Sequence, residues 1–173
     1  MIKQTKILSD EHQIILKVVG ALEKQCAILK EKKEINRDFF EKAIDFIRNY
    51  ADKFHHAKEE NILFVEFCKK AHLAHCNPVE QMLHEHKMGR DYVGGMEKGL
   101  KENNSDFILE NGLKYVELLK AHIMKEDAIL FPMMDEIFNE ETQKLINEKA
   151  EEVEKKFEKG YSDKYLALAD NLN

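Results

Sequence analysis

The 173-residue sequence has no tryptophan, only two prolines and only seven glycines. Proline and glycine interrupt helices, and lysine, glutamate and leucine are abundant instead, so the composition indicates an all-α protein. No apolar run approaches the roughly 18 residues that cross a bilayer. The first residues also lack the apolar segment of a signal peptide. We therefore expect no membrane-spanning or secreted segment.

Cysteine is scarce as well. Cys26, Cys68 and Cys76 are an odd number of thiols without the spacing of a disulfide-rich protein. Reduced cysteines are typical of a cytoplasmic protein, which is the location we expect. Excess positive charge is also lacking, because the formal net charge is −6 and no basic patch stands out. This charge balance argues against nucleic acid as a partner.

The sequence does contain one motif that occurs twice. Residues 55–64 and 122–131 each combine a histidine, a Lys-Glu-acid triplet and an Ile-Leu-Phe run. In each copy a histidine and a glutamate stand four positions apart, and on a helix such residues lie on the same face. Neutral imidazole and carboxylate are ligands that suit iron, manganese or zinc. Each copy therefore offers two metal ligands to one point.

Apolar residues recur at alternating spacings of three and four, which is typical of helices that face the interior of a bundle. The pattern predicts four long helices, over about residues 9–33, 37–71, 78–101 and 105–132. Ser9 and Ser105 are the expected caps of the first and last helix, and Pro132 is expected to end or kink the last. The short loops favour an up-down-up-down four-helix bundle.

A single domain is expected over residues 1–173. The bundle occupies about residues 8–135, and residues 139–173 form a C-terminal helical extension. Within this extension we expect a short amphipathic helix over about residues 140–158. Gly160 ends this helix, and the remaining tail is expected to be weakly helical or frayed.

Each inward-facing stripe contains a histidine, and two stripes also contain a glutamate. These residues are His12 on the first helix, His55 and Glu59 on the second, His86 on the third, and His122 and Glu126 on the fourth. Counting from each turn at 1.5 Å per residue places them near one level of the core. A buried carboxylate costs several kcal/mol unless it is paired or coordinated, so this set predicts a metal site.

The helical periodicity separates some neighbouring candidates and leaves others open. Beside the inward pair of the second helix, His56 and Glu60 are expected to point toward solvent or the helix flank. On the fourth helix, Glu126 and Asp127 both face inward and remain competing ligands. The repeated motif favours Glu126, because it aligns with the glutamate of the first copy.

Six side-chain ligands are more than one zinc ion commonly takes. Two metal ions that share both glutamates as bridges fit the set better and leave positions open for a small ligand. Ligand type alone does not separate iron from manganese, and zinc is compatible with the same residues. Three apolar residues, Ile15, Met82 and Leu119, are expected to wall the site and limit water.

At these residues the chain resembles the hemerythrin-like family, also called the HHE cation-binding domain. The resemblance covers roughly residues 8–135, and its phrases are Asp10-Glu11-His12, His55-x-x-Lys58-Glu59-Glu60, His84-Glu85-His86-x-x-Gly89-Arg90 and His122-x-x-Lys125-Glu126-Asp127. It implies a four-helix bundle with a non-haem, usually oxo-bridged, di-iron centre. The terminal ligands would then be His12, His55, His86 and His122, with Glu59 and Glu126 bridging.

The sequence departs from the oxygen-carrying members of that family. Those members use His-x-x-x-His on the third helix, whereas Met82 stands four positions before His86 here. The fit is closer to members with four histidines and two glutamates, which are linked to nitric oxide, peroxide and iron handling. The resemblance therefore implies a di-iron protein that binds or reduces O2, NO or peroxide. The alternative is an iron, oxygen or NO sensor, or an iron-binding module without turnover.

Overall fold

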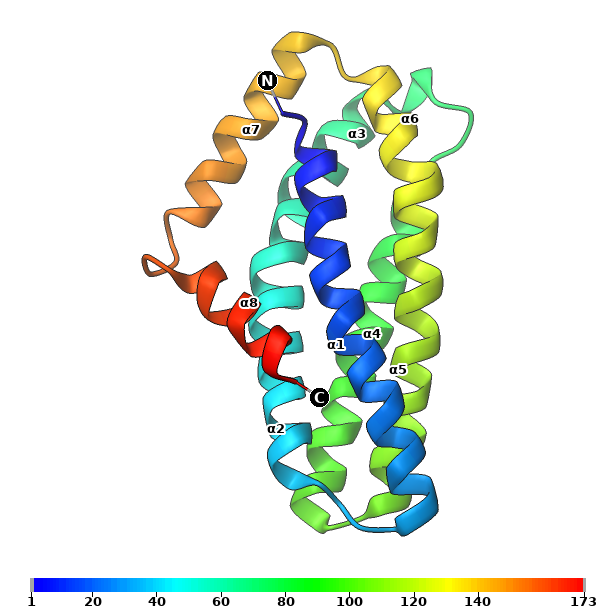
Figure 1. Ribbon diagram of the computed structural model, residues 1–173. Coiled ribbons are helices and arrows are strands. Elements are labelled where there is room, and N and C mark those ends of the chain that lie inside the picture. The colour runs from blue at the N-terminus through cyan, green and yellow to red at the C-terminus, as the bar shows by residue number, and fades with distance from the viewer. Residues whose placement is uncertain (1, 173) are drawn as a thin grey trace.

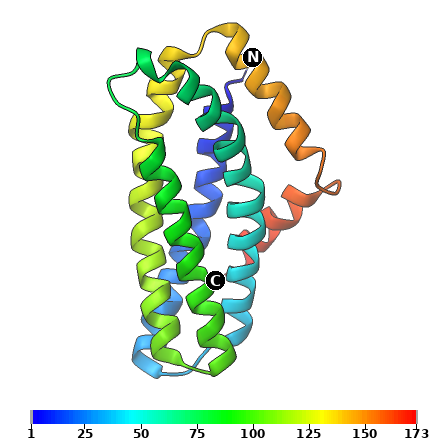
Figure 2. The same ribbon diagram turned by 180° about the vertical axis from the view of Figure 1, so that it is seen from behind.

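The computed structural model describes residues 2–172, and these form helices without any strand. Four long helical rods lie side by side and alternate in direction (Figures 1 and 2). Rod 1 is α1 (Gln4–Lys32) and rod 3 is α4 (Val79–Glu102). Rod 2 is made of α2 (Arg37–Phe46), η1 (Ile47–His56), η2 (Glu59–Leu63), α3 (Phe64–Lys70) and the short turn η3 (Ala71–Leu73). Rod 4 is made of α5 (Ser105–Lys125), η4 (Glu126–Leu130) and α6 (Phe131–Ile137). The predicted all-α bundle is confirmed.

The first helix begins earlier than the sequence pattern predicts. It starts at Gln4 rather than after Ser9, because its first turn packs against the end of rod 4. The hydroxyl of Thr5 donates a hydrogen bond of 2.8 Å to Asp135 on α6. A tertiary contact thus extends the helix beyond the residue whose side chain favours a cap.

The cap of the fourth rod also differs from the prediction by one residue. The side chain of Asn104, not Ser105, accepts a hydrogen bond of 3.0 Å from the backbone N–H of Phe107. The preceding residue, Asn103, has a φ of 51° and ends α4 in the left-handed conformation. Two adjacent asparagines therefore close one helix and open the next, and Ser105 becomes the first helical residue.

Rods 2 and 4 contain π-helical segments at the level of the repeated motif. A π-helix bonds residue i to residue i+5, so each residue turns through a smaller angle than in an α-helix, and such segments are frequent at functional sites. In rod 4 the N–H of Phe131 bonds to the carbonyl of Glu126. The helix does not end at the next residue, Pro132, and continues as α6 to Ile137. The π-helical segment before the proline is η4, and α-helical structure resumes at Phe131.

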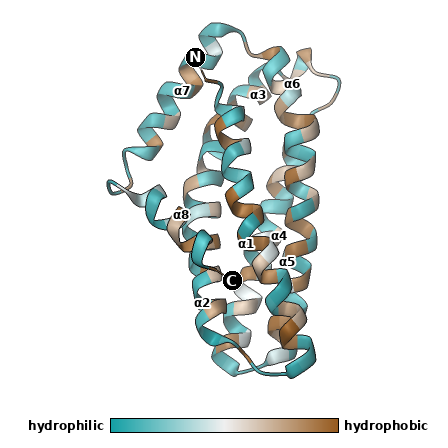
Figure 3. Ribbon diagram, in the orientation of Figure 1, coloured by the Kyte–Doolittle hydropathy of each residue, from teal (hydrophilic) through white to brown (hydrophobic). Residues whose placement is uncertain are grey.

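The buried apolar residues form two separate clusters, one toward each end of the bundle. On α1 the clusters divide between Leu8 and Ile15, and on α4 they divide between Met82 and Val93. Figure 3 shows hydrophobic and hydrophilic residues alternating along each rod. The level between the clusters is the level that the predicted metal ligands occupy, so the polar site interrupts a core that is apolar on both sides.

The C-terminal extension folds back along the bundle as α7 (Glu140–Glu154) and α8 (Tyr161–Asn171) (Figure 1). Helix α7 ends four residues before the predicted boundary at residue 158. The tail is a formed helix rather than a frayed one, because Tyr165 and Ala169 are each only 2% exposed. The hydroxyl of Tyr161 also donates a hydrogen bond of 3.1 Å to the carbonyl of Asn49. Across residues 2–172, no helix is both long and apolar enough to span a bilayer.

Candidate metal centre

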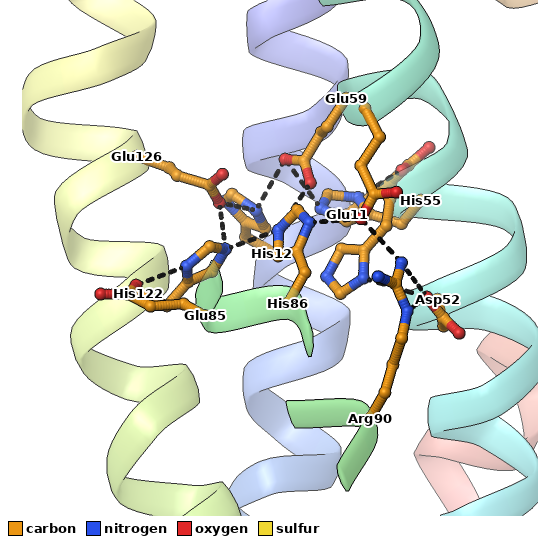
Figure 4. Close-up of polar contacts among 12 residues, drawn as sticks. Glu11, His12, Asp52, His55, Glu59, Glu85, His86, Arg90, His122 and Glu126 are labelled. Atoms are coloured by element: carbon orange, nitrogen blue, oxygen red, sulfur yellow. Dashed lines mark hydrogen bonds and ion pairs between the residues drawn. The ribbon is translucent and has the colours of Figure 1, made fainter. Parts of the chain in front are cut away.

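The six predicted ligands come together at one level of the bundle, with at least one from each rod (Figure 4). None of them is more than 2% exposed. The set consists of His12 from α1, His55 and Glu59 from rod 2, His86 from α4, and His122 and Glu126 from rod 4. The structure therefore brings together all the side chains that the inward stripes selected.

The repeated motif supplies two equivalent pairs. The Nε2 atom of His55 lies 3.2 Å from Oε1 of Glu59, one turn later in rod 2. In rod 4 the Nε2 atom of His122 lies 3.2 Å from Oε2 of Glu126. The i,i+4 spacing places both members of each pair on one helix face, as the sequence predicts.

The two glutamates connect these pairs to the remaining histidines. Glu59 reaches in two directions, with Oε1 3.7 Å from Nε2 of His12 and Oε2 3.6 Å from Nε2 of His86. Oε2 of Glu126 lies 3.4 Å from Nε2 of His12. The Nε2 atoms of His86 and His122 are 2.9 Å apart. The donor atoms thus form a continuous group, with each carboxylate between histidines from different rods.

Several of these inward atoms have no hydrogen-bond partner among residues 2–172. They are Nε2 of His12 and all four carboxylate oxygens of Glu59 and Glu126. Unpaired polar groups at full burial are costly, and charged groups cost most. Two donors bound to one metal at about 2.1 Å would stand roughly 3.0–3.4 Å apart, close to the measured spacings of 3.2–3.7 Å between histidine nitrogen and carboxylate oxygen. The residues present therefore fit a bound cation.

On its outer side, each of the four histidines bonds a carboxylate through Nδ1. The pairs are His12–Asp127 at 2.9 Å, His55–Glu11 at 2.8 Å, His86–Glu60 at 2.7 Å and His122–Glu85 at 2.8 Å. An ionised carboxylate only accepts hydrogen bonds, so Nδ1 carries the proton. When these imidazoles are neutral, their Nε2 lone pairs are directed inward, which is the arrangement that metal-bound histidines use.

A family model described as the hemerythrin HHE cation-binding domain matches residues 4–134. The chain belongs to the hemerythrin family. The match begins with α1 and ends within α6, so it covers the four rods and leaves out α7 and α8. Searches of curated proteins and of solved structures returned no match. Family membership thus indicates cation binding, and the buried histidines and glutamates between the rods include groups that could hold a metal ion.

Two of the outer carboxylates of this hemerythrin domain are held by lysines for which the sequence pattern predicted no role. Lys58 bonds Glu11, and Lys125 bonds Glu85. Lys58 is fully buried despite its charge and also reaches Glu154 of α7 at 3.1 Å. The lysine recurs at the same place in both copies of the motif, so the repeat itself was a usable signal. These lysines fix carboxylates that in turn orient the histidines.

Removing one outer carboxylate is expected to weaken metal binding without removing a predicted ligand. We expect Glu85→Ala to lower metal affinity by about 10–100-fold, because His122 loses the acceptor that fixes its Nδ1–H. Competition with a chelator of known affinity measures the change. Glu80→Ala, at an exposed position of the same helix, is the control and should bind metal like the wild type. Equal affinity of both variants would show that Glu85 does not position His122.

The structure separates Glu126 from Asp127, the pair left open by the sequence. Glu126 is fully buried, with both oxygens facing the histidines. Asp127 has a side chain that is 25% exposed, and it lies behind His12, bonded to Nδ1. Glu126 therefore lies in the inner group of donor atoms, and Asp127 is one of the outer carboxylates.

The prediction that His56 points toward solvent or the helix flank is wrong. This residue is only 8% exposed, and its ring stacks on that of His86, with centroids 3.8 Å apart and planes 13° apart. The π-helical bonding of η1 rotates His56 inward relative to its position in an α-helix. Burial, followed by the charge of His86, lowers the pKa of His56 to about 4.

The charges at the centre strongly shift the ionisation of its members. Burial alone would lower the pKa of His122, but the carboxylates of Glu126 and Glu85 outweigh it and raise the pKa to about 9. The pKa values of His12 and His55 are also raised by neighbouring carboxylates against the effect of burial. Burial and the charge of Glu59 oppose ionisation of Glu126, yet the histidines bring its pKa down to about 2. Without metal, protons on imidazoles balance the buried carboxylates.

A small cavity adjoins the centre on the side of His86 and His122. Its volume is about 20 Å³, enough for roughly one small molecule, since a single water needs about 10–15 Å³. Gly89 lines it, one helical turn after His86. Leu119 and His56 also contribute to the wall. The cavity therefore connects the candidate metal ligands to a space of diatomic or peroxidic size.

Proposed function

We propose that this hemerythrin domain holds two iron ions and binds or reduces a small ligand, namely O2, NO or peroxide. Four histidines would be terminal ligands and two glutamates would be shared between the ions. These are His12, His55, His86, His122, Glu59 and Glu126. The observation that carries the proposal is the set of inward oxygens and nitrogen that are buried without a hydrogen-bond partner in residues 2–172.

The protein's own residues orient the ligands and limit access. The four outer carboxylates hold each imidazole with Nε2 inward, so the donors are in place before a cation arrives. Ile15, Met82 and Leu119, the residues expected to wall the site, are each at most 5% exposed and would restrict the approach of water. Iron, when bound, would supply the electrons or the open coordination position that a diatomic or peroxidic ligand requires.

The iron content of the protein tests whether the centre binds two ions and whether Glu126 or Asp127 is the ligand. Protein produced with iron is expected to carry about two iron ions per chain, by metal analysis together with optical spectra. Glu126→Gln should lower this number to about one or less, because it removes a charged donor from the inner group. Asp127→Asn is the matched control and should retain close to two, because the amide oxygen of asparagine can still accept the Nδ1–H of His12.

Two results would overturn this proposal. A wild-type protein with far less than two iron ions per chain would remove the di-iron centre. An Asp127→Asn variant that loses as much iron as Glu126→Gln would remove Glu126 as the preferred ligand. Steady-state turnover of NO or peroxide then separates an enzyme from a sensor, since a sensor binds its ligand stoichiometrically without turnover.

A further inference from the structure

One buried histidine beside the centre is not among the predicted ligands. His56 lines the cavity together with His86 and His122. One nitrogen from each of these three residues lies within 4.8 Å of the other two. A small molecule in the cavity is therefore within reach of His56 while it adjoins the two candidate ligands.

The outer side of His56 determines which of its nitrogens carries the proton. Nδ1 lies 3.4 Å from Oδ1 of Asp52. The same oxygen accepts a hydrogen bond of 2.8 Å from Nε of Arg90 and lies 2.7 Å from Nη2 of the same guanidinium. Arg90 keeps Asp52 ionised, and an ionised carboxylate cannot donate. The hydrogen between His56 and Asp52 must therefore be on Nδ1.

The consequence is an acceptor at the cavity. In the neutral imidazole with hydrogen on Nδ1, Nε2 has only a lone pair. No hydrogen bond to Nε2 of His56 is formed by any other residue in the range 2–172. The charged side chains of the same wall are already paired, Arg48 with Glu97 at 2.8 Å and Arg90 with Asp52. His56 thus contributes an unpaired acceptor to a cavity whose wall also includes Tyr115. A tyrosine hydroxyl can donate as well as accept, so among these side chains the acceptor-only group is His56.

We propose that His56 accepts a hydrogen bond from the ligand in this cavity and makes the site select hydrogen peroxide over NO and O2. Hydrogen peroxide carries hydrogens that Nε2 can accept, whereas NO and O2 carry none. His56 is then a positioning residue that determines specificity rather than a metal ligand. This inference rests on the proposed function, because it names the ligand class of the same centre.

The first test changes only the acceptor. His56→Phe keeps a flat ring against His86 and removes the nitrogen. We expect it to retain the iron content and resting optical spectrum of the wild type and its affinity for NO within about threefold. The apparent KM for hydrogen peroxide should rise about five- to tenfold, the size of one neutral hydrogen bond. His56→Gln restores an acceptor oxygen and should recover part of the loss.

The second test uses the wild type and does not depend on activity or on the folding of a variant. In the zinc-loaded, diamagnetic protein, nitrogen-15 spectra should show hydrogen on Nδ1 of His56 and none on Nε2. Addition of hydrogen peroxide should shift the Nε2 resonance, while the zinc-loaded protein with Asp52→Asn should lose the fixed tautomer. Hydrogen on Nε2 in the wild type would overturn the proposal.

The outcomes separate this inference from the proposed function. A wild type without iron contradicts the proposed function itself. A wild type with two iron ions whose His56→Phe variant changes NO and peroxide equally contradicts only the specificity assigned to His56. Loss of about one iron ion in His56→Phe would make His56 a metal ligand and would overturn the proposal as well.

Discussion

Chelation is expected to lower the free energy of unfolding of this hemerythrin domain by several kcal/mol. A metal that binds only the native state stabilises it by RT ln(1 + [L]/Kd), about 4 kcal/mol for one site at a thousandfold excess over Kd. The effect should be large here because Glu59 and Glu126 are fully buried with unpaired oxygens in residues 2–172. Urea unfolding of the iron-loaded and the chelated protein measures the difference.

A matched pair of histidine variants tests whether the stabilisation comes from this centre. His55→Ala removes a buried donor, so iron should add little to its stability. His84→Ala removes an exposed histidine of α4 and should keep the full metal-dependent gain. Unfolding curves that are the same with and without metal in the wild type would mean that the buried histidines serve the fold alone.

Much of the inner group could be predicted from helical periodicity. An apolar stripe identifies the face that a helix buries, and a histidine or glutamate within it must lie in the core. This reasoning selected residues such as His12 and His86, which have no repeat to mark them. It worked because α1 and α4 are regular α-helices over these positions. The family match over residues 4–134 agrees with the resemblance seen in the same motifs.

The periodicity argument failed where the helix is not an α-helix. The stripe for rod 2 assumes about 100° per residue, but η1 has π-helical bonding up to His56. The smaller turn per residue carries His56 into the core beside His86. A single sequence contains no clear signal for a π-helical turn, because the turn is stabilised by packing and by the bonds of the site.

The outer carboxylates could not be predicted because their partners lie on other rods. Glu11 on α1 bonds His55 on rod 2, and Glu85 on α4 bonds His122 on rod 4. Such pairs depend on the rotation and height of two helices to within an ångström or so. Sequence spacing fixes positions within one helix and leaves the relative placement of two helices open. The lysine that occurs at the same place in both copies of the motif was the one sequence feature that indicated these outer carboxylates.

The metal-free hemerythrin domain is expected to lose stability as the pH rises from about 6.5 to 9. The folded protein holds a proton on His122 up to a pKa of about 9, because Glu126 and Glu85 outweigh the effect of burial. Below the ordinary pKa of 6.5 both the folded and the unfolded histidine are protonated, and this stabilising contribution is complete. Above 6.5 the unfolded state gives up its proton first, so the contribution declines until the pH passes 9.

The size of this loss follows from the same pKa. A rise from 6.5 to about 9 corresponds to about 3 kcal/mol from His122. His12 and His55 have raised pKa values and add to the loss in the same direction. Urea unfolding of chelated protein at several pH values between 6.5 and 9 measures it, and His84→Ala should show the same decline as the wild type. A flat profile for the chelated protein would contradict protonated imidazoles at the centre.

Metal affinity is expected to depend on pH in the opposite direction to the stability of the metal-free protein. A metal binds neutral imidazole, so uptake near neutral pH must release the protons held by His12, His55 and His122. The apparent metal affinity should therefore rise with pH toward about 9, over the same interval in which the chelated protein weakens. Calorimetric titrations in two buffers of different ionisation enthalpy count the released protons. Because the same histidine nitrogens hold either protons or metal, metal uptake without proton release would show that the ion binds elsewhere.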